Sequence, residues 1–178
     1  MKRFAVFFFT LVVVSLLAVG ADSGQAPTIG SKAPTFNLPT QEGGQISLEQ
    51  FKGKWVVLYF YPKDFTTGCT MEAHNFQRDI EKYTAKNVVI LGVSVDSVDS
   101  HKSFCTKEGL NFKLLSDVTH EVTQKYGSTM EYNGTTMAAR NTFVIDPSGV
   151  VKKIYMKVNP SNHSEQVLAD LDELQPKK

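Results

Sequence analysis

The sequence is poor in cysteine and carries almost no excess of charge. Its 178 residues include two cysteines, Cys69 and Cys105, and the 19 basic and 18 acidic residues leave a formal net charge of +1. No run of lysine and arginine is longer than two residues. Without a basic field to attract phosphates, a nucleic-acid partner is not expected. The two cysteines form no Cys-x-x-Cys pair, which argues against a thioredoxin-type disulfide oxidoreductase.

Long apolar runs are absent except at the N-terminus. Basic residues at positions 2 and 3 precede the apolar stretch 4–19, and the small residues Gly20 and Ala21 follow it. This is the layout of a secretory signal peptide. We therefore predict that residues 1–21 are a cleaved signal peptide, that the mature protein is periplasmic or secreted, and that it keeps no stable association with the membrane. An uncleaved anchor is the alternative, although this stretch is shorter than the roughly 20 residues that span a bilayer.

Residues 22–178 are expected to fold as a single domain. The whole chain is 42% hydrophobic and 21% charged, which is ordinary for a globular protein, and nothing in it indicates a repeat or a low-complexity segment. An oxidising compartment would permit a structural disulfide between the two cysteines. A domain of this length can bury a sufficient core without a disulfide, so stability gives no strong reason to expect a structural disulfide here.

Apolar runs and helical periodicity alternate along this domain. The run 55–61, WVVLYFY, is continuous, which is typical of a central strand that is covered on both faces. Apolar residues at helical spacing then predict a helix over 70–83. The other expected elements are strands 88–95 and 112–117, helices 96–109 and 118–127, a hairpin of 141–146 with 149–158, and a final helix 163–174. This order predicts an α/β sandwich in which helices flank a mixed central sheet, parallel at first and antiparallel at the hairpin.

Cys69 lies between the first core strand and the helix that follows it. A helix N-terminus stabilises a thiolate through its unpaired N–H groups and the positive end of its dipole. The carboxyl end of a strand in an open α/β sheet is also where binding crevices form. The Thr66 hydroxyl can point toward a substrate oxygen or the sulfur, and Pro62 can narrow the pocket. These features predict a reactive thiol, with a buried, inert cysteine as the alternative.

The spacing Pro62-x-x-x-Thr66-x-x-Cys69 resembles the active-site motif of the peroxiredoxins. The resemblance extends from "IGSKAPTFNL" to "RNTFVIDPSGVV" and so covers nearly all of the mature chain. Within that family the chain is most similar to the bacterioferritin-comigratory, or Q-type, branch. The resemblance implies a thioredoxin-like sandwich and a thiol peroxidase that reduces hydrogen peroxide and organic hydroperoxides. His101, His120 and His163 show no spacing suited to a metal site with either cysteine, so no metal ion is expected, and no cofactor is implied.

The resemblance also assigns roles to individual residues. It implies that Cys69 is the peroxidatic thiol, that Thr66 and backbone amides hold the peroxide, and that Arg140, at the head of "RNTFVID", completes the pocket beside Pro62. Donors aimed at developing charge contribute strongly to catalysis, which is consistent with these roles. The product at Cys69 is a sulfenic acid. Glu72 can support the site through a hydrogen bond, or it can be a first-turn acid favoured by the helix dipole.

The resemblance offers two positions for the thiol that resolves the sulfenic acid. Many members of the branch carry a resolving cysteine five residues after the peroxidatic one, where this chain has His74. Others place it in the helix after the second strand, which is where Cys105 falls. We expect Cys105 to resolve by forming a disulfide with Cys69 that a thioredoxin-like dithiol reductant reopens. A one-cysteine enzyme resolved by an external thiol and a non-enzymatic domain with a structural disulfide remain alternatives. The chain resembles a branch whose members are often monomeric, and the sequence itself leaves the oligomeric state open.

Helix geometry makes a further demand on Cys105. Cys69 opens one helix, whereas Cys105 lies about 9–12 Å along the next one at 1.5 Å per residue. A disulfide needs Cα atoms within about 7 Å of each other. We therefore predict that the two sulfurs are not bonded in the reduced fold and that one or both helices unwind locally after oxidation.

Overall fold

The structure is a computed structural model that describes residues 26–175. The predicted signal peptide, residues 1–21, lies outside the described residues. Between residues 26 and 175, none of the helices combines the length and the apolar character needed to cross a bilayer.

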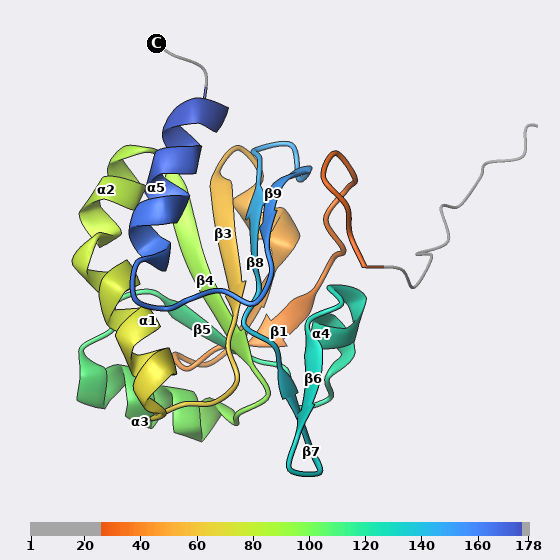
Figure 1. Cartoon of the computed structure of the whole chain (residues 1–178), viewed down its shortest axis with the longest axis vertical. Helices are drawn as coiled ribbons and strands as arrows, with labels where there is room; N and C mark the ends of the chain where they lie inside the picture. The colour runs from red at the N-terminus through yellow and green to blue at the C-terminus, as the bar shows by residue number, and fades with distance from the viewer. Residues whose placement is uncertain (1–25, 176–178) are drawn as a thin grey trace, which may run out of the picture.

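A five-stranded mixed sheet forms the centre of the molecule (Figure 1). Its strand order is β5-β4-β3-β8-β9; β3, β4 and β5 are parallel, β8 is antiparallel to β3, and β9 is antiparallel to β8. The strands are β3 (Trp55–Phe60), β4 (Val88–Ser94), β5 (Lys113–Ser116), β8 (Thr142–Ile145) and β9 (Val151–Tyr155). Every residue of β3 is buried. The predicted mixed sheet and the central position of its first strand are therefore confirmed.

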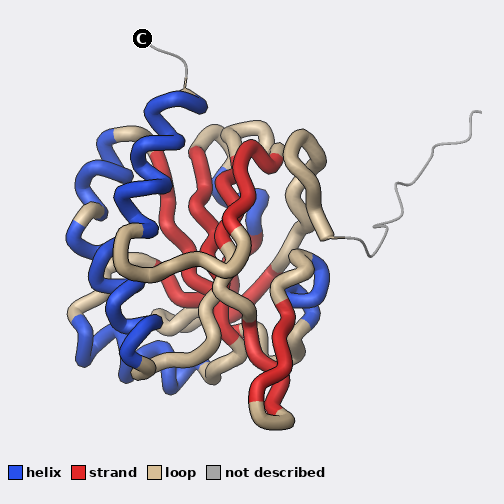
Figure 2. The backbone as a smooth tube through the Cα atoms, in the orientation of Figure 1, coloured by secondary structure: helices blue, strands red, loops and turns tan. Residues whose placement is uncertain are grey.

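The sheet separates two hydrophobic cores, because successive side chains of a strand point to opposite faces. Figure 2 shows most of the helices gathered on one side of the strands. On β3, Val57 and Tyr59 belong to one core, and Val56 and Leu58 to the other. The first core is covered by the helices α1 (Thr67–Arg78), α2 (Ile80–Ala85), α3 (Val98–Glu108) and α5 (His163–Leu174). The second is covered by β1 (Asn37–Pro39), β2 (Gln45–Ser47), η1 (Leu48–Phe51), α4 (Glu121–Lys125) and the hairpin of β6 (Thr129–Tyr132) and β7 (Thr135–Ala138).

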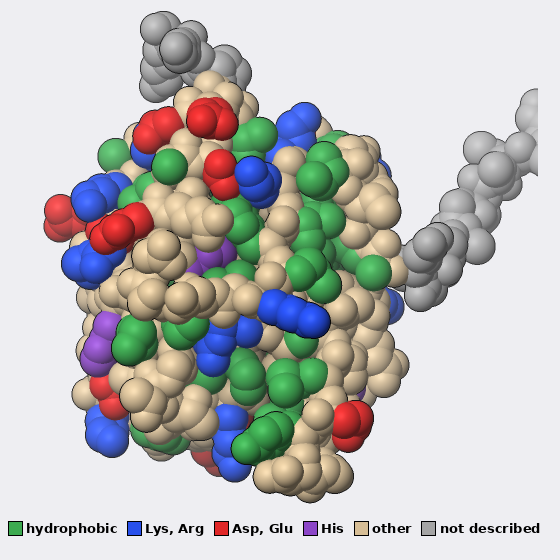
Figure 3. All heavy atoms as spheres, viewed as in Figure 1, with side chains coloured by type: hydrophobic (Ala, Val, Ile, Leu, Met, Phe, Trp, Pro, Cys, Tyr) green, Lys and Arg blue, Asp and Glu red, His purple; other side chains and the backbone are tan. Residues whose placement is uncertain are grey.

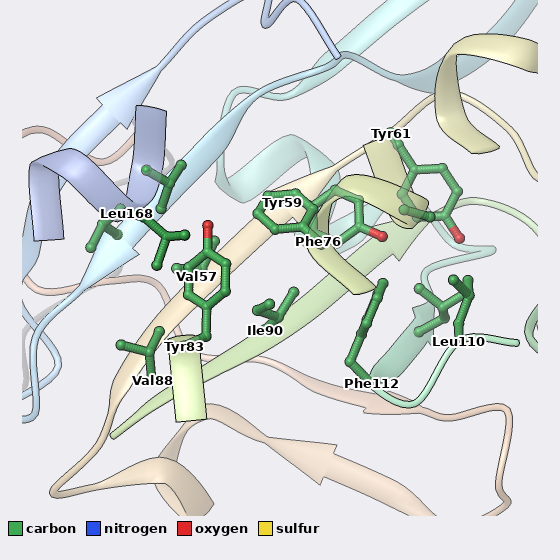
Figure 4. Close-up of a cluster of buried hydrophobic side chains, with 14 of the residues drawn as sticks. Val57, Tyr59, Tyr61, Phe76, Tyr83, Val88, Ile90, Leu110, Phe112 and Leu168 are labelled. Carbon is green, nitrogen blue, oxygen red and sulfur yellow. The ribbon is translucent and has the colours of Figure 1, made fainter. Parts of the chain in front are cut away.

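Aromatic rings fill the core beneath the helices (Figure 4). The ring of Tyr59 lies 4.8 Å from that of Phe76 on α1 and 5.5 Å from that of Tyr61, centroid to centroid. The neighbouring strand has a glycine where this ring crosses it, since a Cβ at Gly92 would come within 2.8 Å of the Tyr59 hydroxyl. The end of β3 that leads to Cys69 is therefore held by close packing.

Ion pairs tie α5 to the two helices beside it. Arg78, the last residue of α1, lies 3.0 Å from Glu165, and Lys86, just after α2, pairs with Asp172. Acidic and basic side chains lie interspersed over these helices on the face that Figure 3 shows. Exposed pairs of this kind each contribute about 0–1 kcal/mol. These pairs join neighbouring helices but add little to the free energy of unfolding.

Two predicted helices differ from the observed ones. The helix expected over 70–83 breaks at Asp79 into α1 and α2, because the buried Asp79 carboxylate accepts hydrogen bonds from Arg78, Lys82 and Ser164. The helix expected over 118–127 shrinks to α4, which begins at Glu121 after His120 adopts a positive φ of 63°. In the first case side-chain contacts break the helix although the apolar periodicity continues, and in the second the left-handed backbone of His120 delays the start of the helix.

Other predicted elements agree with the structure. Helix α3 has Ser97 as its N-cap, with a side chain that accepts from the Ser100 N–H, and Gly109 ends it in the left-handed region. Helix α5 has the predicted bounds, and β8 and β9 pair as an antiparallel hairpin. The β6–β7 hairpin was not predicted, because its short and mostly exposed strands carry no apolar run.

Candidate active site

Cys69 is the third residue of α1 and lies at the end of the loop that leaves β3. Cys69 is 2% exposed, so its sulfur faces the core side of the first turn of α1. Thr66 is the N-cap of α1 in extended conformation, and its carbonyl accepts from the Thr70 N–H. The N–H groups of a first turn have no partner inside the helix, so negative charge on the sulfur is stabilised there.

Arg140 contacts the Cys69 sulfur although it lies 71 positions later in the sequence. It lies just before β8, which pairs with β3, so its chain position brings it to the same end of the sheet as Cys69. Its Nη2 donates to the Cys69 Sγ at 3.2 Å, and its Nη1 donates to a carboxylate oxygen of Glu72. One guanidinium thus joins the thiol to the acid of the next turn, and the three predicted residues meet in space.

The close approach of Arg140 depends on a missing side chain. A Cβ on Gly68 would lie 3.3 Å from Arg140 Nη2, closer than side chains usually pack. Alanine at this position would press on the guanidinium while improving helix propensity. The glycine before Cys69 therefore leaves room for the arginine.

Glu72 is fully buried beside this guanidinium. Burial raises the pKa of its carboxyl to about 7, although the charge and hydrogen bond of Arg140 oppose that rise. Its Oε1 has no hydrogen-bond partner among the described atoms. The hydrogen bond from Arg140 is the supporting contact that the sequence suggested for Glu72. Because Glu72 is buried, it is not a solvated first-turn acid.

The free energy of unfolding is expected to fall as the pH rises from about 4.5 to about 7 because of Glu72. The folded protein holds the carboxyl proton more tightly, with a pKa of about 7 against the ordinary 4.5, so this acid stabilises the fold below 4.5 and loses that effect as the pH passes 7. The difference corresponds to about 3 kcal/mol. Urea unfolding of the wild type and Glu72→Gln between pH 5 and 8 measures it.

The comparison with Glu72→Gln is needed because His163 acts in the opposite direction. Burial lowers the pKa of His163 from 6.5 to about 4, so this residue makes the free energy of unfolding fall as the pH falls from about 6.5 to about 4. Both proteins share His163, and the difference between their two pH profiles isolates Glu72. Parallel profiles would contradict the expected role of the buried carboxyl.

Thr66 and Pro62 lie in the same loop but make no described contact with the sulfur. The Thr66 hydroxyl donates to the Lys63 carbonyl at 3.0 Å, so its proton is used to close the loop in this state. Its oxygen remains able to accept. Pro62 is half-buried directly after β3 and Tyr61. The structure thus places both residues in the loop that joins β3 to the helix of Cys69.

Cys105 lies on α3, apart from this cluster. It is 9% exposed, and both cysteines are free thiols, as predicted for the reduced fold. Burial raises the pKa of the Cys105 thiol to about 12, and the charges of Asp64 and Glu42 add to that rise. In the folded state Cys105 therefore stays protonated near neutral pH. His74, in the position of a local resolving cysteine, instead pairs with Glu108 at 3.0 Å.

Sequence reasoning missed a second polar cluster next to the site. Asp64, in the loop before α1, pairs with His101 of α3 at 2.9 Å, and both side chains are buried. These residues are 37 positions apart, and no local pattern connects them. Within residues 26–175, no three His, Cys, Asp or Glu side chains gather so that they could hold a metal ion.

The fold and the site together define the class of the protein. A thioredoxin-like sandwich with a nearly buried thiol at a helix N-terminus, in contact with a guanidinium, is the arrangement of a thiol-dependent oxidoreductase. Within this class the chain belongs to the AhpC/TSA family, whose model matches residues 29–154, and it is a peroxiredoxin, that is, a thiol peroxidase.

Several relatives support this assignment. The chain is 44% identical over 150 residues to peroxiredoxin bcp of Coxiella burnetii, which covers 80% of this chain and 97% of the relative. A solved mutant of Xylella fastidiosa PrxQ matches with a TM-score of 0.80 at 31% identity, over 84% of this chain and 98% of that one. A peroxiredoxin Q mutant from Xanthomonas campestris matches with a TM-score of 0.75 at 36% identity, over 78% and 90%. The resemblance to the Q-type branch is thereby confirmed.

Proposed function

We propose that Cys69 is the peroxidatic thiol of this peroxidase and that Arg140 and Thr66 serve it in the pocket. The Cys69 thiolate attacks one oxygen of the hydroperoxide, the O–O bond breaks, and the other oxygen leaves as an alkoxide or hydroxide that takes up a proton. The sulfur becomes a sulfenic acid. The observation that carries this proposal is the 3.2 Å contact of Arg140 Nη2 with the Cys69 Sγ.

The two oxygens of the peroxide need fixed donors. The Arg140 guanidinium and the N–H groups at the start of α1 are positive on the side where charge develops. Glu72 holds the guanidinium in place through its other nitrogen. Pro62 shields the loop side of the pocket, and the Thr66 oxygen can accept from the peroxide O–H.

The proposed substrates are hydrogen peroxide and organic hydroperoxides. One solved relative, a bacterioferritin comigratory protein of Xanthomonas campestris, is described by its alkyl peroxide reduction activity. In this chain, Phe65 and Met71 stand on either side of Cys69 in sequence and are 45% and 43% exposed. Apolar side chains of that kind can contact the alkyl group of an organic hydroperoxide.

We assign the resolving role to Cys105. Its thiolate attacks the Cys69 sulfenic acid, a Cys69–Cys105 disulfide forms, and hydroxide leaves; a thioredoxin-like dithiol then reduces the disulfide. The chain offers no other cysteine. Two solved structures of the Xanthomonas campestris peroxiredoxin Q are serine mutants at cysteines 36 positions apart in that chain (84 less 48), the separation of Cys69 and Cys105 here.

The Cys105→Ser protein is expected to consume one equivalent of peroxide and then stall unless an external thiol is supplied. Without a resolving thiol the Cys69 sulfenic acid persists, so turnover in a thioredoxin-coupled assay falls by about a hundredfold or more. Mass mapping of the peroxide-treated wild type should find the Cys69–Cys105 disulfide. Ser103→Ala, an exposed change on the same helix, is the matched control. Wild-type turnover by Cys105→Ser would contradict the assignment and favour a one-cysteine mechanism.

We also propose that the protein acts after export, as a monomer. The charge and apolar pattern of residues 1–21 supports export, and the Q-type resemblance supports the monomer. A reductant that works in the same compartment is then required.

A further inference from the structure

A buried polar cluster joins the catalytic loop to helix α3. The Asp64 carboxylate, 3% exposed, accepts from the Tyr61 hydroxyl at 2.8 Å and from the Ser100 hydroxyl at 2.7 Å. The same carboxylate lies 2.9 Å from Nδ1 of His101, which is fully buried. Tyr61 and Asp64 belong to the segment that leads to Cys69, whereas Ser100 and His101 belong to the helix that carries Cys105.

The His101 ring connects three parts of the molecule. Its Nε2 lies 3.2 Å from the Leu115 carbonyl of β5, which can only accept. Its Nδ1 lies 2.9 Å from the Asp64 carboxylate and 3.3 Å from the Tyr61 hydroxyl. One buried side chain of α3 is therefore held against both the catalytic loop and the sheet.

The loop side of this cluster is fixed more firmly than the helix side. The Asp64 N–H donates to the Asp96 carboxylate at 2.9 Å, and Ser94 donates to the same oxygen at 2.7 Å. The Ser116 hydroxyl donates to the Asp96 carbonyl at 2.6 Å. Ser94 and Ser116 end the parallel strands β4 and β5. Asp64 is therefore anchored to the ends of β4 and β5 through Asp96. If the cluster separates, we expect the contacts between Asp64 and α3 to break.

We propose that Asp64, Ser100 and His101 act as a clasp that sets how often α3 opens and so how fast Cys105 can reach oxidised Cys69. These three are positioning residues for the second step of the reaction, and the inference rests on the resolving role proposed for Cys105. His101 and Cys105 are four positions apart and share one face of α3. Cys105 therefore cannot leave the core with its helical turn unless the clasp opens.

The clasp would divide oxidised Cys69 between two fates. Disulfide formation needs α3 to open, whereas attack of the sulfenic acid on a second hydroperoxide, which yields a sulfinic acid and an alcohol or water, needs only the closed pocket. A strong clasp favours the second fate at high peroxide. Because removing one partner of a buried hydrogen bond leaves the other without a partner, single substitutions in the clasp should have large effects on opening.

Two other contacts join α3 to the catalytic loop and to α1. Phe65, 45% exposed, packs edge-on against Phe104 with ring centroids 5.1 Å apart. His74, whose side chain is 50% exposed, pairs with Glu108. An exposed pair such as His74–Glu108 contributes little because water competes for it. The His74–Glu108 contact therefore supplies a matched control for the buried clasp.

The test measures alkylation of Cys105 in the reduced full chain with Cys69→Ser, in which Cys105 is the sole thiol. Asp64→Asn should raise the alkylation rate about tenfold or more, because an amide cannot accept on both sides of the clasp. Ser100→Ala should raise it by about threefold. His74→Ala should leave it nearly unchanged. Leu171→Ala, on α5, lowers global stability without touching the clasp and should not raise it comparably.

Each outcome decides the proposal. Alkylation at the parent rate in both Asp64→Asn and Ser100→Ala overturns it, and so does an equal rise in Leu171→Ala, which would show that Cys105 is exposed by global unfolding. Ser100→Ala keeps the test valid if Asp64→Asn does not fold. With Cys69 restored, the sulfinic fraction of Cys69 at a fixed peroxide excess should fall in the clasp variants. Failure to detect a Cys69–Cys105 disulfide in any variant would refute the resolving role, while alkylation still judges the clasp.

Discussion

Replacement of Cys69 by serine is expected to reduce peroxide consumption by at least about a thousandfold, as loss of a covalent nucleophile does in other enzymes. A serine hydroxyl keeps its proton near neutral pH, even at the N-terminus of α1, and its oxygen cannot take up the peroxide oxygen as a thiolate does. The substitution is nearly isosteric at a site that is 2% exposed, so the fold should persist. Initial rates of hydrogen peroxide loss, with a dithiol present, measure the effect.

Cys105→Ser is the natural control for this variant. It removes the other thiol of the chain and yet should still consume one equivalent of peroxide, because the pocket around Cys69 is intact. Circular dichroism and urea unfolding should show both variants folded. Peroxide consumption at the wild-type rate in Cys69→Ser would contradict the assignment of Cys69 as the peroxidatic thiol.

The part of the site that the sequence predicts well is local. Pro62, Thr66 and Cys69 lie within eight residues, and their position between a strand and a helix follows from apolar periodicity alone. The sheet could be predicted for the same reason, since β3 is a continuous apolar run buried along its whole length. Arg140 was different: only the family resemblance linked it to Cys69, because nothing near it in sequence encodes a contact across 71 positions.

The parts that could not be predicted depend on tertiary contacts between polar groups. Asp79 ends α1 because its carboxylate meets Ser164 of α5, a partner 85 positions away. Asp64 and His101 look like a loop acid and a helix histidine, and only the folded structure shows both buried and paired. Hydrophobic periodicity reports which face of an element is buried, but it does not report which buried polar groups find each other.

Arg140→Ala is expected to lower the second-order rate constant for peroxide reduction by about a hundredfold to a thousandfold, the usual cost of removing a donor from developing charge. The side chain donates to the Cys69 sulfur, so its loss affects both the thiolate and the departing oxygen. Arg140→Lys should recover little, because one ammonium cannot donate to Cys69 and Glu72 in the fork geometry of a guanidinium. Stopped-flow measurement of the first turnover separates this step from resolution.

The loss of Arg140 also has a structural cost that must be separated from the catalytic one. Glu72 is fully buried and would be left without its cationic partner, which destabilises a protein by about 3 kcal/mol or more when the charge stays. Glu72→Gln removes that charge in place. The double variant Arg140→Ala with Glu72→Gln should therefore regain much of the free energy of unfolding that Arg140→Ala loses.

The rate constant of the double variant decides what the arginine does. If Arg140 acts on the sulfur and the peroxide, the double variant stays as slow as Arg140→Ala even though its stability recovers. If Arg140 serves only to neutralise Glu72, removing both charges restores the rate together with the fold. The geometry favours the first result, because the guanidinium uses one nitrogen for the carboxylate and the other for the thiol, and only the second contact lies on the reacting atom.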